Sequence, residues 1–144
     1  MLTLRAEYIA ADDEPDHVRR IQIKNNLARS MGAEVLKTNI DRRTLVDQDD
    51  EVMTLALAAA VTALPQPGDD VLILTAGKRI DRLHVRYRVA AAVSELTQSR
   101  NLQLNLVRGM EDLISSYRRL ADDRLIQRID WTLKSLKDYG GKGL

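Results

Sequence analysis

Four consecutive apolar residues, Val71 to Leu74, limit the possible folds of this chain more than any other stretch. A glycine and two acidic residues precede them, and Gly77 follows shortly afterwards. A short apolar run between turn-forming residues is typical of a strand buried on both faces, as in parallel sheets with helices on both sides. We therefore predict a central strand at 71–75.

The segments around this strand predict further elements. Alternating apolar residues predict strands at 1–10, 33–40 and 101–109, whereas three- and four-residue spacing predicts helices at 51–64, 79–99 and 110–139, the last broken near Asp122. The segment 17–31 fits either a helix or a short strand that turns at Asn25 and Asn26. Asp49 or Asp50 can cap the helix at 51–64.

The order of these elements defines a fold class. The helix at 79–99 joins the strands at 71–75 and 101–109, and such a connection makes a right-handed parallel βαβ crossover. We predict an α/β fold, a three-layer mixed sheet with one parallel βαβ crossover and a long C-terminal helix. A single domain would span residues 1–139, followed by a flexible tail at 140–144. The opening strand and the strand at 71–75 would be neighbours in the sheet.

Composition narrows the function without assigning it. The 144 residues carry a net charge of +1, so any basic patch that binds nucleic acid must be local. The absence of Cys excludes disulfides, thiol chemistry and Cys-ligated zinc. His17 and His84 stand alone, so we expect each to be exposed or hydrogen-bonded rather than a metal ligand. No apolar run approaches the roughly 20 residues that cross a bilayer, and no signal peptide is visible, so we expect a cytoplasmic protein without membrane contact.

A basic segment follows the predicted central strand. It comprises Lys78, Arg79, Arg82, Arg86 and Arg88. On a helix, Arg79, Arg82 and Arg86 share one side, and such a row can follow the phosphates of a nucleic-acid backbone. The alternative is a solvated face on which Asp81 and Glu95 pair with these cations.

Acidic residues follow the predicted strands or begin the predicted helices. Asp12 follows the first strand, Glu51 begins a helix, and Asp122 and Asp123 lie in the C-terminal helical region. In open α/β sheets, functional sites collect at the carboxyl ends of the strands, where carboxylates from separate elements can hold Mg²⁺. The simpler interpretation is that these acids cap helices and form turns.

The sequence resembles a ribonuclease H-like domain over nearly its whole length. The stretches YIAADD, DDEVMTLALAAAVTAL, VLILTAGKRI and LQLNLVRG resemble, in order, the family's first strand, acid-bearing helix, central strand and last strand. The resemblance implies a metal-dependent nuclease with Asp12 and Glu51 as metal ligands and Asp122 or Asp123 as a further acid. The cofactor it implies for an active enzyme is Mg²⁺.

The chain departs from that family at two positions, and other families compete. Ala76, in the place of the third ligand, cannot bind metal, and Met110, in the place of a frequent histidine, cannot transfer protons. A non-catalytic descendant is therefore favoured. ADDEPDHVRRI and VLILTA resemble a receiver domain, but no strand ending in a phosphorylatable Asp lies between them. Residues 47–77 resemble PIN-like (NYN) nucleases, whose opening Asp-bearing strand is absent here.

Three functional hypotheses follow. In the first, an RNase H-like domain with an eroded metal site binds nucleic acid, or a partner that handles nucleic acid, without efficient catalysis and without a cofactor. In the second, the protein is an active Mg²⁺-dependent nuclease whose catalytic acids are Asp12, Glu51, Asp122 and Asp123. In the third, it is a structural subunit that associates with a protein partner through apolar residues of the C-terminal helix, including Trp131 and Leu133.

Overall fold

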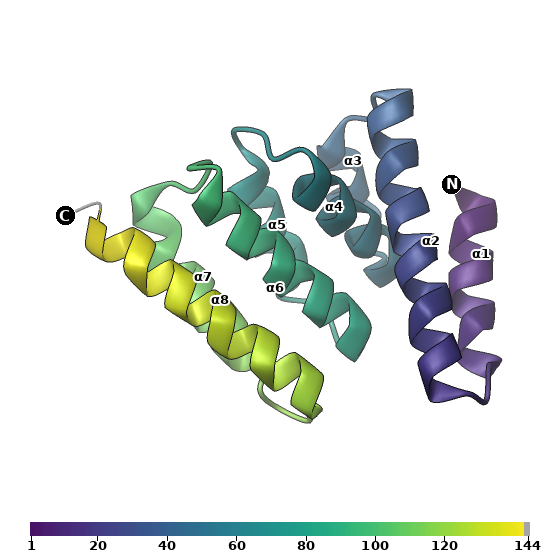
Figure 1. The fold of residues 1–144 in the computed structure, drawn as a ribbon. Coiled ribbons are helices and arrows are strands. Elements are labelled where there is room, and N and C mark those ends of the chain that lie inside the picture. Colours follow the sequence, from purple (N-terminus) through teal and green to yellow (C-terminus); the bar gives the residue numbers. More distant parts are fainter. Residues whose placement is uncertain (143–144) are drawn as a thin grey trace.

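The computed structural model describes residues 1–142, and within this range the chain forms helices and no strand (Figure 1). In chain order the helices are α1 (Leu2–Ala10), η1 (Ala11–Asp13), α2 (His17–Thr38), α3 (Arg42–Asp47), α4 (Glu51–Ala63), α5 (Asp69–Gly77), α6 (Leu83–Gln98), η2 (Leu104–Leu106), α7 (Val107–Ser116) and α8 (Asp123–Lys142). The two η elements are single turns of 3-10 helix. None of the described helices is both long enough and apolar enough to cross a membrane.

The α-helices form two rows. The even-numbered helices α2, α4, α6 and α8 pack side by side in chain order, and α3, α5 and α7 form a second row behind them. The helices also pack on each other within the pairs α1–α2, α3–α4, α5–α6 and α7–α8, so the described part of the chain is a stack of four helical hairpins that runs from α1 to α8 (Figure 1). In such a stack each hairpin buries its apolar face mainly against the hairpins beside it.

Helix α4 is the centre of the core. Every residue from Val52 to Val61 is buried, so the helix is covered on all sides, by α2, α3, α5 and α6. A helix that is apolar all round must be buried in this way. Its alanines allow close packing: a Cβ atom added to Gly32 of α2 would lie only 2.9 Å from the Cβ atom of Ala59. The close contact between α2 and α4 therefore depends on a glycine.

The prediction of a central strand at 71–75 is wrong, because these residues lie in α5. Ile73 and Ala76 face the core at helical spacing, whereas Val71 is 46% exposed. A strand buried on both faces would have covered all of them. Four apolar residues are too few to distinguish a period of 2 from a period of 3.6, and here the helix prevails.

The other three predicted strands are also helical. In 1–10 the alternation is misleading, because Leu4 and Tyr8 meet the core one helical turn apart while Leu2 stays exposed. Within the predicted strand at 33–40, residues 33–38 form the end of α2, and within 101–109, residues 104–109 form η2 and the beginning of α7. With no strand in residues 1–142, the α/β class, the parallel crossover and the RNase H-like three-layer sheet are all contradicted.

Several local predictions are confirmed. Helix α4 matches the predicted helix at 51–64, and the Oδ1 atom of Asp50 caps it by accepting the backbone N–H of Val52 at 2.9 Å. Helix α6 lies within the predicted helix at 79–99, and the C-terminal helical region is interrupted before Asp123. The ambiguous segment 17–31 is helical. Helix α8 continues beyond residue 139 to Lys142, and the rest of the predicted tail lies outside the described residues.

Candidate functional site

A hydrogen-bonded network joins α1, α2 and α6 at one end of the molecule. The Tyr8 hydroxyl lies 2.7 Å from Nδ1 of His84, and Nε2 of the same ring lies 3.0 Å from Oδ1 of Asn25. A guanidinium nitrogen of Arg88 donates to the same Oδ1 atom at 2.9 Å. His84 and Arg88 lie one turn apart on α6, and both contact the same atom of Asn25 on α2.

The hydrogen-bond donors in this network can be assigned by starting from the Arg88 guanidinium. A guanidinium only donates, so the Asn25 atom that faces Arg88 is the amide oxygen, which only accepts. Nε2 of His84 therefore carries the hydrogen, and Nδ1 accepts from the Tyr8 hydroxyl. Burial, together with the nearby positive charges of Arg88, Lys24 and Arg124, lowers the pKa of His84 from 6.5 to about 3. The imidazole is neutral, as this assignment requires.

Four arginines around this network have no acidic partner. Arg29, Arg88, Arg124 and Arg128, from α2, α6 and α8, form no ion pair with any acid among residues 1–142. Burial lowers the pKa of the Arg88 guanidinium, and the positive charges of Arg29 and Arg124 lower it further. The buried Nε atom of Arg88 also has no hydrogen-bond partner.

An aromatic ring holds two of these arginines in place. The guanidinium carbon of Arg124 lies 3.9 Å from the centre of the Tyr87 ring, and that of Arg128 lies 5.1 Å from it. A guanidinium stacked on an aromatic face in this way is oriented and remains able to donate hydrogen bonds. Arg128 also donates to the Tyr87 hydroxyl at 3.4 Å.

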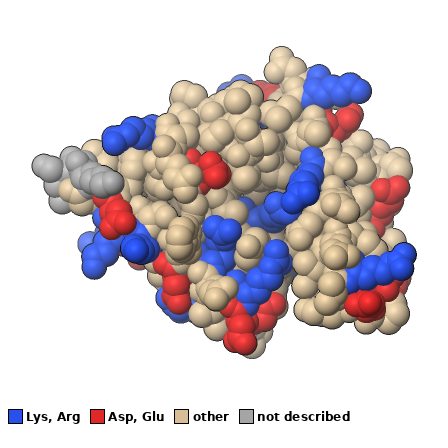
Figure 2. All heavy atoms as spheres, viewed as in Figure 1, with Lys and Arg blue, Asp and Glu red and all other residues tan. Residues whose placement is uncertain are grey.

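These residues surround a groove between α2 and the N-terminal halves of α6 and α8. The hollow has a volume of about 290 Å³. Its charged lining residues are four cations and two acids: Arg20, Lys24, Arg82, Arg124, Asp12 and Asp122. Figure 2 shows Lys and Arg side chains gathered along the hollow that separates α2 from α6 and α8. One helical turn further along lie Arg29, Arg88 and Arg128. We call this surface the basic groove.

The predicted basic set is divided by the structure. Arg79 pairs with Asp49 at 2.6 Å, and Arg82 pairs with Asp12 at 2.7 Å. The Arg86 guanidinium donates to the backbone carbonyl oxygens of Ile80 and Arg119, which ties the loop before α6 to the loop before α8.

Two members of that set remain. Lys78 is exposed at the end of α5, away from the groove. Arg88 lies in the basic groove and has no acidic partner there. Of the five predicted residues, Arg88 alone is an unpaired cation of the groove.

The first two of the predicted acids hold the fold together. The Asp12 carboxylate lies between Lys24 and Arg82 and accepts hydrogen bonds from both. These cations lower the pKa of Asp12 in spite of its partial burial. Glu51 accepts the backbone N–H groups of Asp81 and Arg82, the second through a short hydrogen bond, and so fixes the start of α6.

The remaining acids occupy the start of α8. Oδ1 of Asp122 accepts the backbone N–H of Leu125 at 2.8 Å, and Asp123 is exposed. Within residues 1–142 no three His, Cys, Asp or Glu side chains are grouped so that they could hold a metal ion. The structure therefore does not bring Asp12, Glu51 and the α8 acids into one metal-binding cluster, and Ala76 is buried in α5.

The two predicted interface residues of α8 face different ways. Trp131 is 63% exposed, whereas Leu133 is partly buried and packs against the core. A single exposed aromatic residue is ordinary on a protein surface. Association through α8 stays a prediction.

The sequence interpretation missed most of the groove, although a signal was present. Once 17–38 and 123–142 are taken as helices, Asn25 with Arg29, and Arg124 with Arg128, are pairs four residues apart on one helix face. What the sequence could not show is that α2, α6 and α8 turn these faces toward one another. Comparison with protein-family models, curated proteins and solved structures finds no match to this chain. The fold and the groove therefore define it only as a stack of helical hairpins with a basic groove.

Proposed function

We propose that the protein binds a single nucleic-acid strand by its phosphate backbone in the basic groove. The observation that carries this proposal is the set of four arginines, from three helices, that no acid in residues 1–142 neutralises. The protein as a whole has nearly equal numbers of acids and bases, with 22 Lys and Arg against 21 Asp and Glu. The cluster of four unpaired arginines therefore reflects where charges are placed in this groove and not an excess of bases in the protein as a whole.

Electrostatics favours an anionic ligand at this place. Burial lowers the pKa of the Arg88 guanidinium most, and repulsion from the positive charges of Arg29 and Arg124 adds to this effect. A phosphate between these groups would relieve the repulsion and accept charge-assisted hydrogen bonds, which are about twice as strong as neutral ones. Arginine is well suited to this role because its planar fork of donors matches two phosphate oxygens.

The shape of the groove favours a single strand over a duplex. The hollow has room for about 290 Å³, and its cations repeat along the helices at one-turn intervals of about 5.4 Å. A duplex is too wide to enter this groove and could bring only a few phosphates of one strand to its cations. A single strand can place successive phosphates beside successive helical turns. The arginine planes stacked on Tyr87 offer flat surfaces on which bases can stack.

Fluorescence anisotropy with a labelled single strand of about 20 nucleotides, in RNA and in DNA form, tests the proposal across a salt series. We expect binding at low salt that weakens steeply as salt rises, with a slope of about −0.7 for each phosphate contacted. A duplex of the same length and a polyglutamate peptide serve as comparators, and both should bind more weakly. Absence of binding to either strand at low salt, or tighter binding of polyglutamate, would contradict the proposal.

A further inference from the structure

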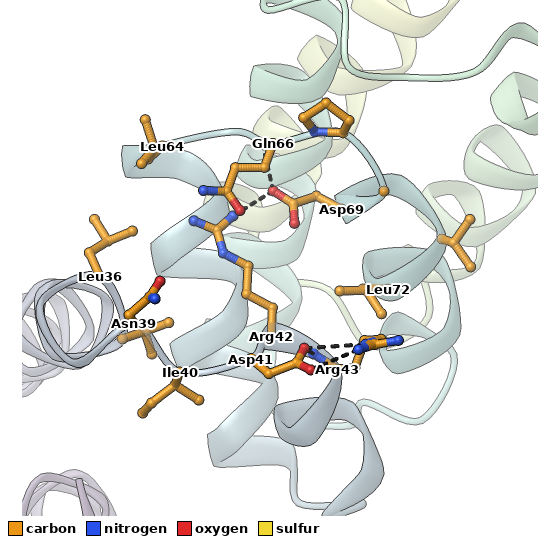
Figure 3. Close-up of a pocket in the computed structure, with 14 residues that line it drawn as sticks. Leu36, Asn39, Ile40, Asp41, Arg42, Arg43, Leu64, Gln66, Asp69 and Leu72 are labelled. Atoms are coloured by element: carbon orange, nitrogen blue, oxygen red, sulfur yellow. Dashed lines mark hydrogen bonds and ion pairs between the residues drawn. The ribbon is translucent and has the colours of Figure 1, made fainter.

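A second and larger cavity lies at the other end of α2 from the basic groove. It has a volume of about 710 Å³, within the range of small-molecule sites. The end of α2, the beginnings of α3 and α5 and the loop between α4 and α5 form its walls (Figure 3). Its apolar lining includes Leu36, Ile40, Leu64 and Leu72.

A buried ion pair forms the polar end of this cavity. Arg42 is only 8% exposed, and its Nη1 atom donates to Oδ2 of Asp69 at 2.5 Å. The same oxygen accepts the backbone N–H of Gln66 at 2.8 Å. Figure 3 shows the guanidinium held beside Asp69, with the Gln66 side chain lying over it.

The second terminal nitrogen of this guanidinium has no partner. Nη2 of Arg42 is buried, and no protein atom in residues 1–142 accepts a hydrogen bond from it. A buried donor without a partner costs free energy, so each such group calls for an explanation. Gln66 is exposed on the loop between α4 and α5, and Figure 3 draws its side chain next to this guanidinium, so we take Gln66 as the group whose movement gives a ligand access to Nη2.

The charges of the lining determine which kind of acceptor fits. Arg42 is balanced by Asp69, and Arg43 is balanced by Asp41 at 2.9 Å, so the four charged groups of the lining sum to zero. Burial raises the pKa of Asp69 because its charged carboxylate is poorly solvated, and a ligand carboxylate at the same depth would meet the same cost. A neutral oxygen acceptor therefore fits Nη2 better than a carboxylate.

From these observations we infer that the cavity binds a small neutral molecule that carries a carbonyl oxygen on an apolar body. The carbonyl oxygen accepts the hydrogen bond of Arg42 Nη2 once Gln66 moves aside. The apolar body lies against Leu36, Leu64 and Leu72. Amides of medium-length carboxylic acids have this chemistry.

Hexanamide is the probe, with hexanoate as its charged comparator, and nuclear magnetic resonance titration of the full chain is the measurement. We expect hexanamide to shift the backbone resonances of Asn39, Leu64 and Leu72, which line the cavity, and to leave those of the basic groove unchanged. Hexanoate should bind at least about tenfold more weakly, which corresponds to about 1.4 kcal/mol. Equal or tighter binding of hexanoate would overturn the choice of a neutral ligand.

Two matched variants locate the site. Val71 lines the cavity and is 46% exposed, so Val71→Trp can fill the opening without disturbing the core. Val18 is 63% exposed on α2 and does not line the cavity, so Val18→Trp is the control. Val71→Trp should weaken hexanamide binding at least about tenfold and Val18→Trp less than twofold. Equal effects of the two variants, or no saturable shift with the unmodified protein, would overturn the inference.

A double variant tests the hydrogen bond itself. Arg42→Met with Asp69→Leu removes both charges, so no unpaired charge is left buried. We expect the double variant to lose the preference for hexanamide over hexanoate. A preference that stays unchanged would show that Arg42 does not hold the ligand.

Discussion

Tyr8 and His84 are 76 positions apart in sequence, and the hydroxyl of the first donates to Nδ1 of the second at 2.7 Å. Tyr8 is fully buried. The contact fixes α1 against α6 at the inner end of the basic groove, and through Asn25 it reaches α2 and Arg88. The shape of the groove thus depends on a histidine that must stay neutral.

This relationship predicts a pH-dependent stability. The pKa of His84 is 6.5 in the unfolded chain and about 3 in the folded protein, so between these values only the unfolded state takes up the proton. Stability is therefore complete above about pH 6.5 and falls as pH decreases toward 3, by about 1.4 kcal/mol per pH unit from this residue. Urea unfolding at a series of pH values between 7 and 4 measures the slope.

His84→Gln is the matched variant for that measurement. Glutamine can accept from Tyr8 and donate to Asn25 but does not titrate. We expect the variant to have a shallower dependence of stability on pH in this range, with its groove intact. An unchanged slope would show that another group causes the loss of stability in acid.

The contact of α2 with α4 predicts opposite effects at two helical glycines. A Cβ atom at Gly32 would lie 2.9 Å from the Cβ atom and 3.0 Å from the backbone carbon of Ala59, whereas one at Gly109 would meet only Leu74 at 3.5 Å. Gly32→Ala should destabilise the protein by about 1–3 kcal/mol through overpacking. Gly109→Ala should stabilise it by about 0.5–1 kcal/mol through helix propensity. Thermal and urea unfolding of both variants would show the contrast, and stabilisation by Gly32→Ala would contradict the close packing.

The ion pair of the apolar cavity predicts a non-additive pair of substitutions. Arg42→Met alone leaves the buried Asp69 carboxylate without its partner and should cost about 3–5 kcal/mol. The double variant Arg42→Met, Asp69→Leu should be much closer to the original stability. A double-mutant cycle in urea measures the difference, and simple additivity would contradict a direct interaction between the two side chains.

We expect Glu51 to stabilise the fold and not to bind a metal ion. Its carboxylate accepts two backbone N–H groups at the start of α6, so Glu51→Ala should cost about 1–3 kcal/mol by leaving these donors unpaired. Addition of Mg²⁺ should change the unfolding curve of neither form, because no cluster of acids surrounds this residue in the described structure. Stabilisation of the original protein, but not of the variant, by millimolar Mg²⁺ would restore the metal-ligand hypothesis.

The sequence was most informative where local signals agreed. Helix α4 combines a capping aspartate, Asp50, with a long run of Leu and Ala residues, and the sequence predicts both of its ends to within one residue. Around Val71 the local sequence and the tertiary packing disagree. The β-branched residues favour a strand, but a helix buries Ile73 against the other helices. Tertiary packing determined that choice, and the α/β prediction failed with it.

The basic groove shows a second limit on what the sequence alone can predict. The sequence indicates Arg88 as a candidate, but its neighbours Arg29 and Arg124 come from α2 and α8, whose arrangement follows from how the hairpins stack. The arginines that looked most prominent in sequence, Arg79 and Arg82, are neutralised by Asp49 and Asp12. Charge pairing between distant segments is visible only in three dimensions.

Two double variants of equal charge compare the groove with the rest of the surface. Arg124→Gln with Arg128→Gln removes two unpaired cations of the groove, and Arg43→Gln with Arg118→Gln removes two surface cations that are paired with Asp41 and Asp130. Both variants change the net charge equally. At about 0.15 M salt, charges more than about 8 Å from the ligand are largely screened.

Binding of the labelled single strand to these two variants is the deciding measurement. The groove variant should bind at least about tenfold more weakly, with the slope of log affinity against log salt reduced in size by about 1.4 for the two lost contacts. The surface variant should bind within about twofold of the original protein. Equal weakening of both, or none in the groove variant, would contradict binding in the basic groove.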